Sequence, residues 1–117
     1  MSQKNDSLGE FQHFREKMNE AILASGNLAV NRFFALDKQA YGDGALPKKT
    51  KELMGLVASM VLRCDDCITY HLIQCRAEGA TDEEIMETFS IALVVGGSIV
   101  IPHLRRAVAR LEELKDA

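Results

Sequence analysis

Apolar residues recur every three or four positions along almost the whole chain, a spacing typical of one face of an α-helix. In the first segment the apolar positions are Leu8, Phe11, Phe14, Met18 and Ile22. Gly26 is expected to end this helix, because glycine readily adopts the left-handed conformation at a helix end. Asn27 has a side chain suited to cap a second helix over residues 28–41. The pattern therefore predicts two consecutive amphipathic helices.

The middle of the chain repeats this spacing after a loop. Residues 42–47 contain two glycines and end in proline, which predicts a turn, and a third helix is expected to begin near Lys48. The phase of the pattern changes at residues 63–66, so we expect a fourth helix to start there and to run to Ala77. The apolar stripe of the third helix comprises Leu53, Leu56, Val57, Met60 and Val61.

Capping and turn signals predict two further helices. Thr81 with Glu84 three residues later is a capping-box sequence. The pair Gly96-Gly97 is expected to break that helix or to let it pack tightly, and Pro102 fits only the first turn of a last helix. No strand pattern is present. The sequence therefore predicts an all-α fold of about six helices, in a single domain over residues 1–117.

The size of the chain adds one expectation. With 117 residues, of which 47% are apolar, it has the length and composition of one domain with a modest core. Small cores are often supplemented by association between chains. Because the first two helices are rich in phenylalanine and leucine, we expect them to form a helical interface in a homo-oligomer.

Charge and hydropathy exclude some classes of partner. The net charge of −3 argues against nucleic acid or an anionic membrane surface as the main partner. The longest apolar run, residues 91–101, is interrupted by two glycines and is shorter than the roughly 20 residues that span a bilayer. The first ten residues are polar and do not resemble a secretory signal. These features predict a cytoplasmic protein, in which paired cysteines are catalytic or metal-binding rather than structural.

All three cysteines and one histidine are concentrated in residues 63–75, RCDDCITYHLIQC. On one helix, Cys64, Cys67, His71 and Cys75 fall within about 80° of arc. Cys64 and Cys67 are close enough to form a disulfide, and His71 lies one turn after Cys67, where it can take the thiol proton. The positive end of the helix would further favour a thiolate. This arrangement predicts a reactive cysteine pair.

Other interpretations of the same stretch remain open. Asp65 and Asp66 oppose thiolate formation, because nearby carboxylates raise a thiol pKa. The cysteines could instead belong to an apolar core face, which is the expected role of Cys75. A zinc-binding structural module is a third alternative, although three ligands on one helical stripe surround a tetrahedral ion poorly. His103 is expected to be structural, or to reach the site from the last helix.

Glu52 lies twelve residues before Cys64 and completes the spacing E-x11-C-x2-C-x3-H with Cys67 and His71. This spacing, together with the flanking text LPKKTKELMGLVASMVLRCDDCITYHLIQCRAEGATDEEIMETFSIALVVGG, resembles the alkylhydroperoxidase D-like group of the carboxymuconolactone decarboxylase family. The similarity covers roughly residues 25–112.

The resemblance implies a thiol-dependent peroxidase that has no resident cofactor. In that group Cys67 would attack a small-molecule peroxide, Cys64 would resolve the sulfenic acid as a disulfide, and His71 with Glu52 would relay the proton. A dithiol protein, such as a lipoylated carrier, would reduce the pair, and Cys64 is expected to be the more accessible sulfur. The resemblance also implies a homo-oligomer, with a hexamer favoured over a trimer.

One position departs from the resemblance. Asp66 occupies a place between the two cysteines where relatives often carry a histidine. A general disulfide oxidoreductase or a redox sensor is therefore an alternative to a peroxidase. A decarboxylase of the carboxymuconolactone type, using Glu52 and His71 as acid and base, is a further alternative that would not need the cysteine pair.

Overall fold

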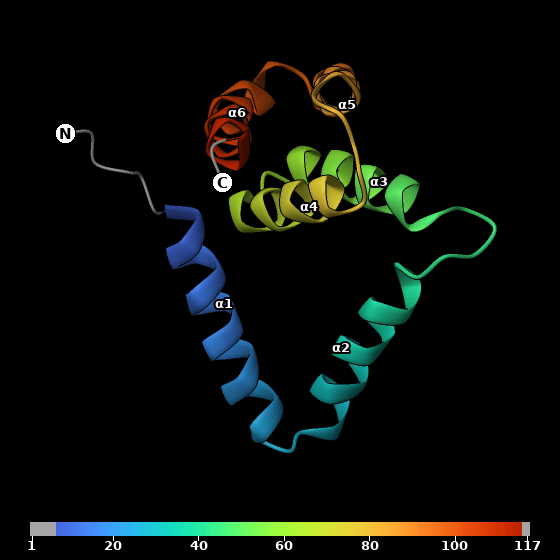
Figure 1. The fold of residues 1–117 in the computed structure, drawn as a ribbon, viewed down its shortest axis with the longest axis vertical. Coiled ribbons are helices and arrows are strands. Elements are labelled where there is room, and N and C mark those ends of the chain that lie inside the picture. Colours follow the sequence, from blue (N-terminus) through green and yellow to red (C-terminus); the bar gives the residue numbers. More distant parts are fainter. Residues whose placement is uncertain (1–6, 116–117) are drawn as a thin grey trace. The chain divides into compact units, whose positions relative to one another are not determined.

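The computed structural model describes residues 7–115, and within that range every regular element is a helix, with no strand (Figure 1). This confirms the predicted all-α fold of about six helices. The helices are α1 (Ser7–Ala24), α2 (Leu28–Ala40), α3 (Lys48–Val61), α4 (Asp65–Ala77), α5 (Asp82–Gly96) and α6 (Ile101–Lys115), with a short 3₁₀ turn, η1 (Ser98–Val100), before α6. The predicted loop at 42–47 and the predicted break at Gly97 are present, and a turn with Gly79 at φ +85° follows α4.

The chain divides into two compact units, Met1–Gly42 and Asp43–Ala117. The first unit contains α1 and α2, and the second contains the other helices. The interpretation of residues 1–117 as a single domain stays a prediction.

The first unit is a pair of helices joined by a short turn. Gly26 adopts φ +75° there, and the Asn27 side chain accepts a hydrogen bond from the Val30 N–H at 3.0 Å. Neither helix has a buried residue. Phe33 in α2 is 67% exposed. Other apolar side chains that this unit leaves exposed are Phe14, Met18, Ile22, Leu23, Leu28 and Leu36.

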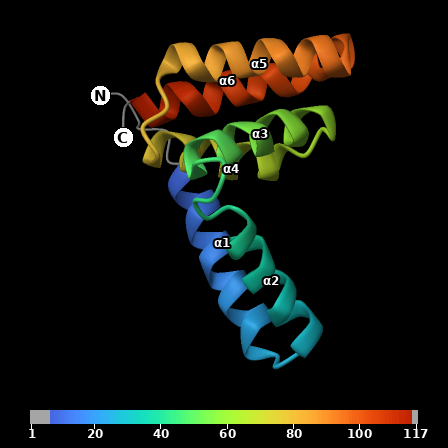
Figure 2. The ribbon, with the colours of Figure 1, turned by 90° about the vertical axis from the view of Figure 1, so that its right-hand side faces the viewer.

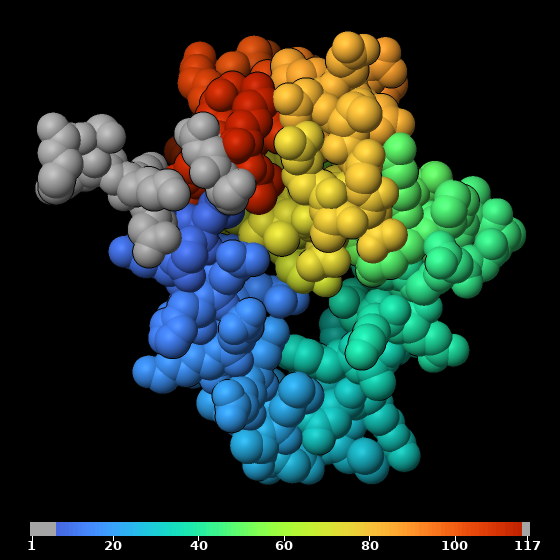
Figure 3. Space-filling model, viewed as in Figure 1, coloured from blue at the N-terminus to red at the C-terminus, as the bar shows by residue number. Residues whose placement is uncertain are grey.

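The second unit has the hydrophobic core. Helix α3 packs against α4 and α5, and α4 packs against α6. Figure 2 shows α5 and α6 on one side of the α3–α4 pair, and the space-filling view shows the atoms of α3 to α6 closed into one body (Figure 3). The apolar stripes of all four helices supply the core, whose fully buried larger members are Leu56, Met60, Ile68, Leu72, Ile85, Phe89 and Val100.

A glycine sets how closely the end of α5 approaches its neighbours. A Cβ atom at Gly96 would lie 2.5 Å from a methyl group of Val100 and 3.5 Å from one of Val61. Gly97 then turns the chain at φ +84°. Tight packing and a break, the two roles predicted for this glycine pair, are therefore both found.

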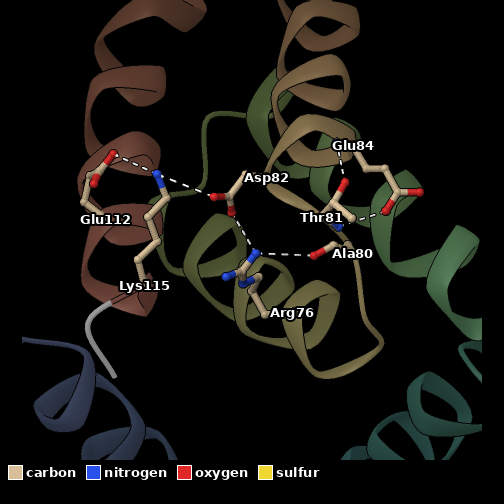
Figure 4. Close-up of polar contacts among 7 residues, drawn as sticks. All are labelled: Arg76, Ala80, Thr81, Asp82, Glu84, Glu112 and Lys115. Carbon is tan, nitrogen blue, oxygen red and sulfur yellow. Dashed lines mark hydrogen bonds and ion pairs between the residues drawn. The ribbon is translucent and has the colours of Figure 1, made fainter.

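Polar contacts join the helix ends of the second unit (Figure 4). The Arg76 guanidinium lies 2.7 Å from the Asp82 carboxylate, and the Lys115 ammonium lies 3.5 Å from the same side chain. The capping box is formed, because Thr81 Oγ1 accepts from the Glu84 N–H and the Glu84 carboxylate accepts from the Thr81 N–H. These contacts fix the ends of α4, α5 and α6 relative to one another.

The three methionines of the second unit differ in exposure. Met60 is fully buried, but Met54 and Met86 are 55% and 48% exposed.

Over the described part of the chain, none of the helices combines the length and apolar character needed to cross a membrane.

Candidate functional site

The turn between α3 and α4 joins a helix end directly to a helix start. The N–H groups of Arg63 and Cys64 donate to the carbonyl oxygens of Met60 and Ser59, both at 3.0 Å. This bonding is the Schellman pattern, which places the residue after the cap in the left-handed region. Arg63 has φ 60° there and is the one non-glycine residue with positive φ in the described range. Such a conformation costs about 1–2 kcal/mol, so the surrounding contacts must hold the turn in place.

Cys64 follows Arg63 and is the N-cap of α4. Its sulfur accepts a hydrogen bond from the Cys67 N–H at 3.3 Å, as an oxygen does in the usual cap. Cys64 and Cys67 are joined as a disulfide, with their Cα atoms 5.2 Å apart. The spacing predicted that this pair could bond, and the helix start is where both sulfurs meet the positive end of the helix dipole.

The two cysteines differ in exposure. Cys67 is exposed, whereas Cys64 is only partly exposed. This is the reverse of the expected order, in which Cys64 was to be the more accessible sulfur. Cys64 is the N-cap of α4 and its N–H is bonded to the Ser59 carbonyl of α3, whereas Cys67 lies in the first turn of α4.

Glu52 and His71 form a buried pair between α3 and α4. Glu52 Oε1 lies 2.8 Å from His71 Nδ1, and the two residues are 0% and 8% exposed. Because an ionised carboxylate can only accept, Nδ1 is the donor in this contact. His71 lies one helical turn after Cys67, a separation at which side chains on one helix are neighbours.

Lys48 completes the charge balance of this pair and was not identified from the sequence. Its ammonium lies 3.2 Å from Glu52 Oε2. Burial lowers the pKa of Lys48, but the hydrogen bond and the charge of Glu52 outweigh burial, so the pKa is raised and Lys48 stays protonated. The buried carboxylate thus contacts a cation through one oxygen and the His71 ring through the other. The i,i+4 spacing of Lys48 and Glu52 was a signal that could have found this contact.

A second carboxylate–histidine contact lies at the first turn of α4. His103 Nδ1 and an Arg106 nitrogen, both from α6, lie 2.8 Å and 3.3 Å from the two oxygens of Asp65. This contact fits both roles expected for His103, so the choice between a structural histidine and a residue of the site stays a prediction. Asp65 and His103 are 38 residues apart, so no local spacing could have revealed the contact.

Cys75, the third cysteine, lies in the core as expected. It is a free thiol with 0% exposure, and burial, helped by the charge of Glu52, raises its pKa to about 12. At neutral pH it is therefore a neutral apolar group that does not compete with the pair.

Two further features bear on what the site can hold. Among residues 7–115, no three or more His, Cys, Asp or Glu side chains are arranged to hold a metal ion. An open groove of about 590 Å³ lies between α3 and α5 and is lined largely by Leu53, Met54, Val57, Thr88 and Ile91. None of the four candidate site residues lines this groove.

The arrangement consists of a buried acid–base pair and a cysteine pair that share one helix. Glu52 holds the imidazole of His71, Cys67 lies one turn before His71 on α4, and Cys64 is the N-cap of that helix. Such a set can remove a proton from a thiol and can exchange two electrons through a disulfide.

Comparisons with known proteins match this architecture. Residues 28–110 match the model of the carboxymuconolactone decarboxylase family. Two crystal structures of a Thermotoga maritima protein share 64% and 63% identity with the chain, with TM-scores of 0.89 and 0.88. The alignments cover 92% of this chain and 94% and 91% of those chains. That protein is described as a member of the same family, and a part in the antioxidative response has been suggested for it.

Two more distant relatives agree. A Legionella pneumophila protein of the family, solved in its apo form, shares 28% identity and a TM-score of 0.85 over 93% of this chain and 97% of its own. An uncharacterized protein of the cox locus of Paracoccus denitrificans is 39% identical over 85 residues, which are 73% of this chain and 77% of that protein.

Proposed function

Because the chain belongs to the carboxymuconolactone decarboxylase family, we propose that it is a thiol-dependent peroxidase of the alkylhydroperoxidase type. The proposal assigns Cys67 as the nucleophile, Cys64 as the resolving thiol, His71 as the base and Glu52 as the residue that orients it. The antioxidative role suggested for the Thermotoga maritima relative is of the same kind. The reaction needs reduced thiols at rest, so we place it in the cytoplasm.

The observation that carries the proposal is the buried contact between Glu52 and His71 on the helix that bears the cysteine pair. A carboxylate 2.8 Å from Nδ1 fixes the ring orientation and makes Nε2 the proton acceptor. Lys48 places an opposite charge 3.2 Å from the other oxygen of this buried carboxyl group.

The proposed cycle balances in three steps. The Cys67 thiolate attacks one oxygen of the peroxide, the O–O bond breaks, and the alkoxide leaves with a proton as an alcohol. The resulting sulfenic acid is attacked by the Cys64 thiol, which forms the disulfide and releases water. A dithiol protein then passes two electrons and two protons to the disulfide and is itself oxidised to a disulfide. The chain needs no resident cofactor for this cycle.

The reductant is proposed to be a lipoylated carrier, whose two thiols match a two-electron exchange. The exposed residue Cys67, rather than Cys64, is the more accessible point for its attack. Attack there would release the Cys64 thiolate, which the Cys67 N–H and the helix start stabilise as a leaving group.

We further propose that the first unit packs against a second copy of this chain, in a homo-oligomer and most simply a hexamer. Isolated helices of 18 and 13 residues are marginal in water, and these two bury no residue. Phe14 and Phe33 are 68% and 67% exposed, which is unusual for side chains of this size. Burial against another chain would supply the core that the first unit lacks.

Single substitutions with peroxide and a dithiol reductant test the peroxidase proposal. Cys67→Ser is expected to abolish turnover, and Cys64→Ser to allow one oxidation without a disulfide. His71→Gln is expected to slow the attack about 10²–10⁴-fold, the usual contribution of a general base. Cys75→Ser is the matched control, because this thiol is buried and neutral, and should turn over like the wild type. Undiminished turnover in Cys67→Ser would refute the assignment.

A general disulfide oxidoreductase is the second candidate, favoured by the exposure of Cys67 and by Asp66 between the cysteines. Comparing the rates with a peroxide and with an oxidised dithiol peptide separates the two functions. A decarboxylase would instead retain activity in a Cys64→Ser/Cys67→Ser double variant and lose it in Glu52→Gln.

A further inference from the structure

Two side chains of α6 contact one carboxylate in the first turn of α4. Asp65 Oδ1 lies 2.8 Å from His103 Nδ1, and Asp65 Oδ2 lies 3.3 Å from an Arg106 nitrogen. Because ionised Asp65 can only accept, both α6 side chains donate to it. The His103 side chain is 19% exposed and the Arg106 side chain 60%, so His103 makes the better shielded of the two contacts.

Asp65 lies between the two cysteines of the pair in the sequence. It is the residue directly after Cys64 and two before Cys67, in the turn where Arg63 adopts φ 60°. A carboxylate at this place disfavours a thiolate on either sulfur, because like charges repel. The donor groups of His103 and Arg106 partly offset the Asp65 charge and thereby weaken that repulsion. The same contacts also hold the turn whose backbone is strained.

We propose that His103, supported by Arg106, is a positioning residue for the cysteine pair: it holds Asp65 against α6 and sets the reduction potential of the Cys64–Cys67 disulfide. This inference rests on the proposed redox function. His103 acts through Asp65 and is not itself in contact with the reacting atoms.

The direction of the effect follows from charge. The reduced pair carries the thiolate, so a feature that stabilises the thiolate favours the reduced form and makes the disulfide more oxidising. Removing His103 leaves Asp65 less compensated and therefore favours the disulfide. Neutralising Asp65 removes the repulsion and favours the dithiol. The two substitutions break the same contact but are expected to shift the equilibrium in opposite directions.

The test is the equilibrium of the pair with a glutathione buffer, in which two glutathione thiols supply two electrons and become one disulfide. The full chain is equilibrated at a series of buffer ratios, acid-quenched and alkylated, and the reduced fraction is read by mass spectrometry. Thiolate absorbance of the reduced protein below about pH 9 gives the lower thiol pKa, and Cys75 does not contribute because burial raises its pKa to about 12.

His103→Ala is expected to shift the exchange constant about tenfold toward the disulfide, equivalent to about 30 mV. Asp65→Asn is expected to shift it by a similar factor toward the dithiol. His103→Asn keeps an N–H donor near the Nδ1 position and should restore most of the wild-type value. Arg106→Gln should act like His103→Ala but more weakly. Arg105→Gln, which removes a neighbouring charge from α6 without touching Asp65, is the matched control and should leave the constant unchanged.

The proposal is overturned if His103→Ala and Asp65→Asn shift the constant in the same direction, or if neither shifts it in protein that remains folded by circular dichroism. A contact that is only structural would lower thermal stability in both variants without opposite shifts of the exchange constant. Should wild-type protein form no reversible Cys64–Cys67 disulfide, this inference and the proposed redox function both fail. Reversible wild-type cycling with unshifted variants removes this inference alone.

Discussion

The two units of this chain contain similar amphipathic helices but differ in what those helices bury. Helices α3 to α6 enclose a core with fully buried Leu56, Leu72 and Phe89, whereas α1 and α2 bury no residue at all. Both units have a good N-cap, Asn27 for α2 and Thr81 for α5. Local helix signals therefore do not predict which helices stabilise the fold, because most helix stability in a protein comes from packing of the apolar face.

Shortening one phenylalanine in each unit tests this contrast most strongly. Phe89→Ala is expected to lower the free energy of unfolding by about 3–5 kcal/mol, because it opens a cavity in the core. Phe33 is 67% exposed within the chain, so any loss of unfolding free energy in Phe33→Ala should depend on protein concentration. Denaturant unfolding at two protein concentrations measures both. Equal, concentration-independent losses would contradict the contrast.

Placing a charge on the first unit tests whether its exposed apolar side chains are covered by another copy. Burying one phenylalanine at an interface contributes about 1.5–3 kcal/mol, and a carboxylate at Phe33 would remove this and add a desolvation cost. Phe33→Asp should therefore yield smaller assemblies in sedimentation velocity. Gln39→Asp places the same charge at an exposed polar position of α2 and serves as its control. An unchanged sedimentation coefficient in Phe33→Asp would remove the first unit from any interface.

Removing the cap from one helix in each unit gives a smaller effect. Thr81→Ala breaks the capping box of α5 and is expected to lower global stability by about 1 kcal/mol. Asn27→Ala removes the 3.0 Å bond to the Val30 N–H, and should chiefly increase hydrogen exchange at the start of α2. Thermal unfolding combined with residue-resolved exchange compares the two. Global destabilisation by Asn27→Ala equal to that of Thr81→Ala would place both helices in one cooperative unit.

The smallest expected effect is a pH dependence confined to the second unit. The backbone hydrogen bond from Thr81, followed by the contact with Lys49, lowers the pKa of Glu84 below its usual 4.5. A group with a lowered folded pKa stabilises the fold above its unfolded pKa, and this contribution is lost as the pH falls through the folded value. The stability difference between wild type and Glu84→Gln should therefore shrink below about pH 4.5. A difference that is constant from neutral to acidic pH would contradict this.

The helices and the local part of the candidate site could be predicted from the sequence. Spacing and caps placed Gly26, Asn27, Thr81 and Pro102 correctly, because a helix and its ends depend on residues within a few positions of one another. For the same reason the sequence identified Cys64, Cys67 and His71 as members of one helical stripe. The partner Glu52 came from a resemblance, since its distance of nineteen positions from His71 has no helical meaning.

The contacts between helices could not be predicted from local sequence and were found in the tertiary structure. It buried Glu52 against His71, brought His103 and Arg106 from α6 to Asp65, and left Phe33 exposed. It also made Cys67 more exposed than Cys64, which the helical wheel could not show. These outcomes depend on which faces of separate helices meet, and that is set by packing the whole core rather than by any short stretch of chain.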